Sequence, residues 1–308
     1  MNKKYKSLTV SLITLFFLFS FLLNNEIMIK TFFDTTKLWF YNLFHSIFIF
    51  FIITDILNNY HFPYYLSKMF GKIISKIYKL PKESSYIIFM SMTSGFPGNS
   101  KLIKEQLDSK RISLFDANKL LTMTHFSNPL FILFTIGNNF LHNQKIGLLI
   151  LLVHFVTNFL LGFFFRNIYH QDYIKENYQL EKSLPFMEML KKSITNTFSS
   201  LINVFGIIIF FALLTKTINL YLNLKPFTNV LLNGILETTN GLSLLSNLHL
   251  SIKNKALLST FFISFGGFSI HMQVMSLLNK YDINYYLYLI SRILHAVISS
   301  LLLFLLLI

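Results

Sequence analysis

Polar, glycine-containing tips interrupt the apolar sequence at two places, and both carry residue types that can bind a solute inside a membrane. The first tip, TSGFPGNSK, covers residues 93–101, and the second, ETTNG, covers residues 237–241. Each tip ends an apolar run of about ten residues, half of the about 20 that a spanning helix needs, and such short runs often mark re-entrant segments. Irregular backbone at membrane depth must face protein or a water-filled cavity. We therefore predict two re-entrant hairpins, near residues 84–107 and 227–247, whose backbone groups are available to a solute.

Each predicted hairpin is followed by an apolar segment that is broken near its middle. In the first segment, Pro129 has no backbone donor and disfavours a helical conformation at Asn128. In the second, Gly266 and Gly267 weaken the helix. The order span, hairpin, broken span, span thus occurs twice, and the distribution of charge makes the two hairpins enter from opposite sides. This order is typical of inverted-repeat transporters, in which discontinuous helices form a solute site near the bilayer midplane.

The two charged residues at the tips are the strongest candidates for ion chemistry. Glu237 is a carboxylate at the second tip, and a carboxylate at membrane depth is costly unless it is paired or hydrated. We expect Glu237 to bind a coupling proton or Na⁺; at an ordinary external loop it would have no such role. Lys101 follows the first tip, where it could attract an anion together with the N–H groups of a half-helix. A cytoplasmic lysine that only sets the topology is an equally good explanation of Lys101.

The other candidates are polar, aromatic, proline or glycine residues at the tips and breaks. The predicted substrate-binding residues are Ser94, Gly95, Phe96, Pro97, Gly98, Asn99, Ser100, Lys101, Asn128, Pro129, Thr238, Thr239, Asn240, Gly241, Gly266, Gly267, Ser269, His271 and Gln273. We expect these segments to meet near the midplane, because each leaves backbone groups that hydrocarbon cannot satisfy. For the polar side chains beside the breaks, hydrogen bonds between helices are the alternative role.

The composition predicts a polytopic membrane protein. Of the 308 residues, 53% are hydrophobic and 13% are charged, whereas a soluble domain carries about 25% charged residues. The apolar residues come in blocks long enough to span hydrocarbon. No A-x-A cleavage site follows the first block, which we interpret as an uncleaved span. The predicted spans are residues 8–23, 38–57, 113–141, 146–165, 197–222, 252–278 and 285–308.

The positive charges predict the orientation. Most lysines and arginines fall in loops that lie inside if the N-terminus is cytoplasmic, and this bias sets the topology of membrane proteins. Seven crossings then place the C-terminus outside. Topology also accounts for the net charge of +14, and without a contiguous basic motif we expect no nucleic-acid binding. Residues 64–80 carry lysines on one face at helical spacing, which predicts an amphipathic helix on the cytoplasmic surface.

The sequence contains no recognisable enzyme or cofactor motif. There are no cysteines, which excludes disulfides and thiolate metal sites. The P-loop, HExxH and GxSxG patterns are absent, and Glu237 alone does not make an acid pair. We expect no enzymatic activity, no cofactor and no metal.

The predicted fold is all-α, with about seven spanning helices and two re-entrant hairpins in an inverted repeat. We divide the chain into an N-terminal anchor helix and external loop (1–37), a first repeat (38–166), a cytoplasmic linker (167–196) and a second repeat (197–308).

Four motifs occur along the chain in a fixed order: SGFPGNSKLIKEQL, SNPLFILFTIG, ETTNGL and SFGGFSIHMQV. Together they resemble the YlbJ family of sporulation integral membrane proteins, within the nucleoside-recognition "Gate" superfamily. The resemblance extends over about residues 38–300, and both repeats are therefore expected to be Gate-like. Where the family has a small Gly-Ala pair before the lysine of the first motif, this chain has Asn99 and Ser100.

The resemblance implies a membrane permease of spore-forming bacteria, similar in architecture to concentrative nucleoside transporters. It suggests movement of dipicolinate, a small aromatic dianion, from the mother cell towards the forespore. The location would be the bacterial cytoplasmic membrane or the outer forespore membrane. The alternatives are a nucleoside or other small-solute permease and a non-transporting scaffold that recruits sporulation partners. Expected partners are the solute, the lipid bilayer, a coupling proton or Na⁺, and either a second copy of the chain or sporulation membrane proteins.

Overall fold

The computed structural model describes residues 3–168 and 182–308, and the regular elements within these ranges are all helical. The elements are α1 (Lys3–Leu23), α2 (Asn25–Trp39), the π-helix η1 (Phe40–Phe44), α3 (His45–Asn59), α4 (Phe62–Tyr78), α5 (Ser84–Ser94), α6 (Gly98–Asp108), α7 (Leu114–Met123), the π-helix η2 (Phe131–Phe140), α8 (Gln144–Phe164), the 3₁₀-helix η3 (Phe165–Asn167), α9 (Phe186–Leu222), α10 (Pro226–Leu236), α11 (Thr238–Ser246), α12 (Ile252–Phe265), α13 (Gly267–Leu277) and α14 (Tyr285–Leu306).

Within the described residues, five helical stretches are long and apolar enough to cross a membrane, judged by length and composition. They are Asn25–Asn59, Gln144–Asn167, Phe186–Leu222, Ile252–Leu277 and Tyr285–Leu306. The chain is therefore a multi-pass integral membrane protein. The other two predicted spans are less regular. The apolar part of α1 is shorter, and the segment predicted at 113–141 is split between α7 and η2.

Two boundaries differ from the sequence prediction. Residues 24–37, which we expected to form an external loop, are helical in α2, and α2 continues through η1 into α3. The reason is packing, because Met28 of α2 is fully buried against α9. Helix α9 begins at Phe186 rather than near residue 197, so it includes the end of the predicted linker. Residues 169–181 of that linker lie outside the described residues.

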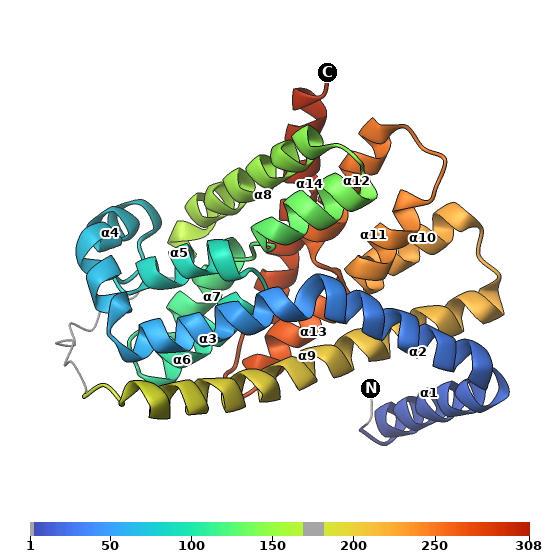
Figure 1. The fold of residues 1–308 in the computed structure, drawn as a ribbon, viewed down its shortest axis with the longest axis horizontal. Helices are drawn as coiled ribbons and strands as arrows, with labels where there is room; N and C mark the ends of the chain where they lie inside the picture. The colour runs from blue at the N-terminus through green and yellow to red at the C-terminus, as the bar shows by residue number, and fades with distance from the viewer. Residues whose placement is uncertain (1–2, 169–181) are drawn as a thin grey trace.

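The order of elements is repeated along the chain. The first half has α3, the short pair α5 and α6, then α7 and η2 on either side of a break, then α8. The second half has α9, the short pair α10 and α11, then α12 and α13 on either side of a break, then α14. Figure 1 shows the opening helices α3 and α9 running along each other, and these two helices pack together, as do the closing helices α8 and α14. Both halves thus contribute corresponding elements to one helical body.

Amphipathic helix α4 has the form that its sequence predicts. Leu66, Ile74 and Tyr78 are buried against the core, while Lys68 and Lys72 are exposed. The apolar residues Ile73 and Ile77 of the same helix remain exposed. An apolar surface beside exposed lysines is what a helix at a membrane surface needs.

Buried polar side chains join α7, α8 and α14. Arg292 of α14 is fully buried, and its Nη1 donates to His295 Nδ1 (3.0 Å) while its Nη2 donates to Thr122 O (2.5 Å). His295 Nε2 donates in turn to His154 O of α8 (3.0 Å). A guanidinium group inside an apolar core is costly unless it is hydrogen-bonded. These bonds therefore fix the three helices relative to one another.

A second link joins the loop before α14 to the end of α6. The Tyr281 hydroxyl donates a hydrogen bond to Asp108 Oδ1. This bond raises the pKa of Tyr281 to about 12, so the phenol stays protonated at neutral pH. The loop therefore remains attached to the first short helix pair under ordinary conditions.

Candidate functional site

The first tip and the first break lie against each other. Phe96 N donates to Phe126 O (2.8 Å). Gly95 adopts a φ of +70°, and a Cβ at this residue would lie 2.5 Å from Asn128 N. The left-handed conformation and the close backbone approach both require glycine here. The two segments that were predicted to be irregular are thus packed directly together.

The second tip and the second break meet in the same way. Gly267 adopts a φ of +61°, and a Cβ at this residue would lie 2.7 Å from Thr238 Oγ1. The neighbouring glycine, Gly266, connects the two halves, since a Cβ there would lie 2.5 Å from Nε2 of His125 in the first break. Both tips and both breaks therefore belong to one contiguous region.

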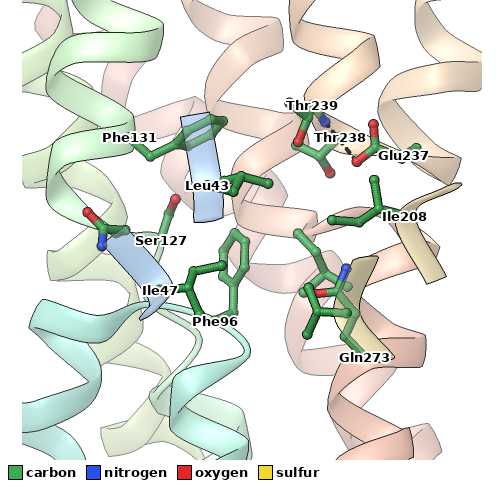
Figure 2. Close-up of a pocket in the computed structure, with 13 residues that line it drawn as sticks. Leu43, Ile47, Phe96, Ser127, Phe131, Ile208, Glu237, Thr238, Thr239 and Gln273 are labelled. Atoms are coloured by element: carbon green, nitrogen blue, oxygen red, sulfur yellow. Dashed lines mark hydrogen bonds between the residues drawn. The ribbon is translucent and has the colours of Figure 1, made fainter. Parts of the chain in front are cut away.

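This region surrounds a cavity with an empty volume of about 530 Å³, which includes its open part. Figure 2 shows residues of the first half on one side of it and residues of the second half on the other. The cavity is lined by Leu43, Ile47, Phe96, Ser127, Asn128, Phe131, Val204, Ile208, Glu237, Thr238, Thr239, Ile270 and Gln273. Apolar walls with a few converging polar groups are typical of small-molecule sites.

Glu237 is the one charged residue among the described residues of the lining, and it is 2% exposed. Its carboxylate caps α11, because Oε1 accepts from Thr239 N (3.2 Å) and Oε2 accepts from Asn240 N (2.7 Å). Figure 2 shows the carboxylate at the start of this helix. Backbone N–H groups at a helix N-terminus stabilise a negative charge. The carboxylate is therefore held in place while its side chain remains part of the cavity wall.

The first half supplies a flat aromatic wall and an amide. The Phe96 ring is stacked on the His125 imidazole, with centroids 4.7 Å apart and planes inclined by 24°. Asn128 Oδ1 accepts from Leu130 N (2.8 Å), which caps the helix that restarts after the break. From the second half, Gln273 is buried and also lines the cavity.

Several predicted site residues line this cavity: Phe96, Asn128, Thr238, Thr239 and Gln273, together with Glu237. The others are not part of its lining: Ser94, Gly95, Pro97, Gly98, Asn99, Ser100, Lys101, Pro129, Asn240, Gly241, Gly266, Gly267, Ser269 and His271. Several of these residues lie outside the cavity and contact the segments that line it. Asn99 Nδ2, for example, donates to Thr124 Oγ1 beside the first break (3.4 Å).

Lys101 lies apart from the lining, in an ion pair with Asp55 of α3. Its Nζ also lies 3.9 Å from Glu105 Oε1, and Asp55 Oδ2 accepts from Ser193 Oγ of α9 (3.0 Å). The lysine, Asp55 and Ser193 are all buried. This cluster joins α3, α6 and α9, so the charge of Lys101 is already compensated within the fold.

His271 faces a second hollow on the other side of α13, lined by Phe211, Leu236, Phe268, His271, Met272, Met275 and Tyr285. Its Nε2 donates to Phe265 O (3.0 Å), and its Nδ1 lies 3.3 Å from the Tyr285 hydroxyl. The imidazole is thus engaged in hydrogen bonds between helices. Among the described residues, no group of three or more His, Asp or Glu side chains could hold a metal ion.

The sequence analysis missed seven lining residues: Leu43, Ile47, Ser127, Phe131, Val204, Ile208 and Ile270. Four of them form two similar pairs. Leu43 of η1 and Ile47 of α3 come from one continuous helical stretch of the first half, and Val204 and Ile208 come from α9, the opening helix of the second. Residues four apart share one helix face, but in an apolar span nothing in the sequence distinguishes this face from a lipid-facing one. Ser127 was predictable, since it is in the SNP break.

Comparison with known proteins agrees with the motifs. The chain is 25% identical over 302 residues to the sporulation integral membrane protein YlbJ of Bacillus subtilis (strain 168), and the match covers 86% of this chain and 74% of that protein. The chain is thus similar to a YlbJ protein over most of its length. No family model matches the chain, and no solved structure matches it significantly. The resemblance to YlbJ that the four motifs predicted is therefore confirmed.

The match to YlbJ extends over most of the chain, so it is not limited to apolar composition in one span. In this chain, the FP and SNP motifs contribute Phe96, Ser127 and Asn128 to the cavity. The ETTNG motif contributes Glu237, Thr238 and Thr239, and the SIHMQ motif contributes Ile270 and Gln273. The four motifs thus contribute most of the residues that line the cavity.

Proposed function

We propose that the chain is a secondary transporter of a small polar or anionic solute. The observation that supports this most strongly is the cavity, whose wall combines both tips, the first break and the helix that follows the second break. Helix ends leave backbone groups without partners inside their own helix. In a membrane-embedded body such ends are tolerated where they face protein or a water-filled space. A solute site between two structurally repeated halves accounts for all four irregular segments together.

The mechanism we propose is alternating access around this cavity. The pairs α5–α6 and α10–α11 act as re-entrant hairpins that enter from opposite sides, and their tips lie near the bilayer midplane. Rocking of one repeat against the other would open the cavity to each side in turn. The N-terminus is then cytoplasmic and the C-terminus is outside, in the bacterial cytoplasmic membrane or the outer forespore membrane.

The coupling ion in this mechanism is a proton or Na⁺ bound at Glu237. The support is geometric, since this carboxylate is buried, lines the cavity and is fixed by two backbone N–H groups. Intramembrane acids commonly mark ion pathways. Binding of the cation would cancel the charge of the cavity wall and allow the occupied site to reorient.

For the solute we propose dipicolinate, carried during sporulation. The relative YlbJ is named as a sporulation protein, and we extend this role to the present chain. The resemblance to that family suggests dipicolinate in particular. A nucleoside permease is the second candidate within transport, and the aromatic wall formed by Phe96 favours either of these planar solutes.

A non-transporting scaffold that recruits sporulation partners is the alternative from a different class. A scaffold has no use for a cavity with buried polar groups between its two halves. Buried polar groups without hydrogen-bond partners reduce the stability of a protein. A scaffold would gain nothing from this cost, whereas a transporter needs such groups to bind its solute, so the cavity favours transport.

Uptake into proteoliposomes tests the proposal. The purified full chain is reconstituted, and entry of labelled dipicolinate and labelled uridine is compared with entry into empty liposomes. We expect uptake of one of them that saturates and is abolished by Glu237→Gln. If neither compound enters faster than in empty liposomes, under a proton or a Na⁺ gradient, the transporter proposal for these solutes is wrong.

A further inference from the structure

Two residues that line the cavity have side-chain hydroxyl groups without a hydrogen-bond partner among the described residues. They are Ser127 Oγ from the first half and Thr238 Oγ1 from the second half. The two residues are 1% and 2% exposed. Buried polar atoms are nearly always hydrogen-bonded, so each exception needs an explanation. Among the buried polar atoms without a partner in the described residues, these two belong to residues that line the cavity, and a cavity can hold the missing partner.

The fold holds Ser127 in a fixed place while leaving its hydroxyl free. Its backbone N–H donates to His154 Nε2 (2.9 Å). The other ring nitrogen of His154, Nδ1, donates to Ser264 Oγ of α12 (3.0 Å). Nε2 accepts a hydrogen bond and therefore carries no proton. A neutral imidazole has one donor and one acceptor, so the proton is on Nδ1. The irregular segment around Ser127 is thus held by a hydrogen bond from its backbone N–H, and the Ser127 side chain takes no part in that bond.

Thr238 is held in a comparable way. It is the first residue of α11, directly after the Glu237 cap, and its side chain occupies the space left by the absent side chain of Gly267. The Glu237 carboxylate takes the N–H groups of Thr239 and Asn240. The Thr238 hydroxyl therefore remains as a neutral group at a helix start where the N–H groups of Thr239 and Asn240 are already bound by Glu237.

We propose, on the basis of the transporter function proposed above, that Ser127 and Thr238 bind the solute by one hydroxyl from each half. The solute they fit is planar, has hydrogen-bonding groups at two ends, and carries no uncompensated negative charge. A hydroxyl both donates and accepts, so the pair can bind carboxyl, amide or ring-nitrogen groups. Phe96, stacked on His125, provides a flat surface between them.

The condition on charge follows from the described lining. Glu237 is its one charged residue, and Lys101 is compensated by Asp55 outside it. Like charges in a poorly solvated site repel strongly. An aromatic dicarboxylate therefore enters this cavity together with protons or a metal cation, which makes the solute and its companion ion a single cargo.

Measurements of Tm and of transport together distinguish a solute-binding role of Ser127 and Thr238 from a structural role. In Ser127→Ala and Thr238→Val, KM for labelled dipicolinate in proteoliposomes should rise about tenfold each. The Tm of the solute-free protein in detergent should stay the same or rise, because each change removes a buried group without a partner. Thr238→Ser keeps the hydroxyl and should retain the original KM.

Two buried hydroxyls that do have partners serve as matched controls. Ser193 Oγ donates to Asp55 Oδ2 (3.0 Å), and Thr260 Oγ1 donates to Ala256 O (2.9 Å). Both lie outside the cavity lining. Ser193→Ala and Thr260→Val should lower Tm and leave KM unchanged. Should Ser127→Ala and Thr238→Val behave like these controls, the two hydroxyls are structural and the inference is overturned.

Dipicolinate-induced stabilisation separates failure of the inference from failure of the transporter proposal. A ligand that binds the folded state raises Tm. If dipicolinate raises Tm but is not transported, the transporter proposal falls, and loss of the Tm shift in Ser127→Ala and Thr238→Val still supports the inference. If dipicolinate and uridine neither raise Tm nor enter, both proposals fall.

A separate measurement tests whether the solute must enter without an uncompensated negative charge. Uptake of labelled dipicolinate at a fixed concentration should increase when the pH is lowered or when a divalent cation is added. Uptake that responds to neither change would mean that the free dianion is accepted, and that part of the inference would be overturned.

Discussion

Lys101 and Asp55 form a buried ion pair that joins α6 to α3, and this pair keeps the lysine charge out of the cavity. Ser193 of α9 donates to the same carboxylate. The short helix that follows the first tip is therefore attached at its start to the opening helices of both halves. The pair holds this short helix in place, and in the site proposed above the solute would be bound by neutral groups.

Removal of one member of this pair should destabilise the protein more than removal of both. Lys101→Met leaves a buried carboxylate unpaired, which costs about 3–5 kcal/mol. In the double variant Lys101→Met/Asp55→Leu, most of that loss should be recovered, because a buried ion pair can be replaced by apolar residues at little net cost. Thermal unfolding in detergent measures the stability of the single and the double variant. A role of Lys101 in solute binding would instead appear as a raised KM in the double variant at unchanged Tm.

Glu237→Gln should abolish coupled uptake while the protein stays folded. The glutamine carbonyl oxygen can still accept from an N–H group at the start of α11, so the cap is partly retained. The negative charge that would bind a proton or Na⁺ is lost. Uptake under each ion gradient is the measurement, with Tm as the test of folding. Glu26→Gln, on the exposed part of α2, is the matched control. Full activity of Glu237→Gln would exclude this carboxylate as the coupling site.

Much of the architecture was predictable because helix breakers and apolar blocks are local signals. The Pro129 break, the Gly266–Gly267 break and both short helix pairs occur where the sequence indicated. The helix over 24–37 was not predictable, because Asp, Thr and Lys residues there resemble an external loop. Burial of Met28 and Trp39 against α9 outweighs that local composition.

The candidate site was predictable only in part. Polar tips and breaks indicated Phe96, Asn128, Glu237 and Gln273 by residue type. The pairing of Lys101 with Asp55 depends on how α6 lies on α3, a tertiary relationship that a lysine after a glycine-rich tip does not reveal.

His154→Leu should lower stability and also loosen the first break. The imidazole accepts from Ser127 N and contacts Ser264 Oγ, so its removal leaves buried polar groups unpartnered. Each such group costs about 1–3 kcal/mol. We expect a lower Tm together with faster amide exchange at residues 124–128, measured by hydrogen–deuterium exchange. His142, in the turn before α8, provides a control substitution outside the core. Unchanged exchange at the break would show that His154 does not anchor it.

Gly95→Leu should abolish transport, whereas Gly206→Leu should have little effect. At Gly95 a side chain must accept a φ of +70° and a Cβ 2.5 Å from Asn128 N, so the first tip has to separate from the first break. At Gly206, on α9, nothing lies within 4 Å of a Cβ, and the added side chain points away from the described core. Both variants exchange glycine for leucine, so they differ in the surroundings of the added side chain and not in the residue types exchanged. Uptake of labelled dipicolinate and the amount of inserted protein are measured for both variants. The loss for Gly95→Leu should exceed tenfold at equal insertion, because contact between tip and break shapes the cavity wall at Phe96 and Asn128. Equal uptake by the two variants would mean that the close packing of tip and break is not needed for solute movement.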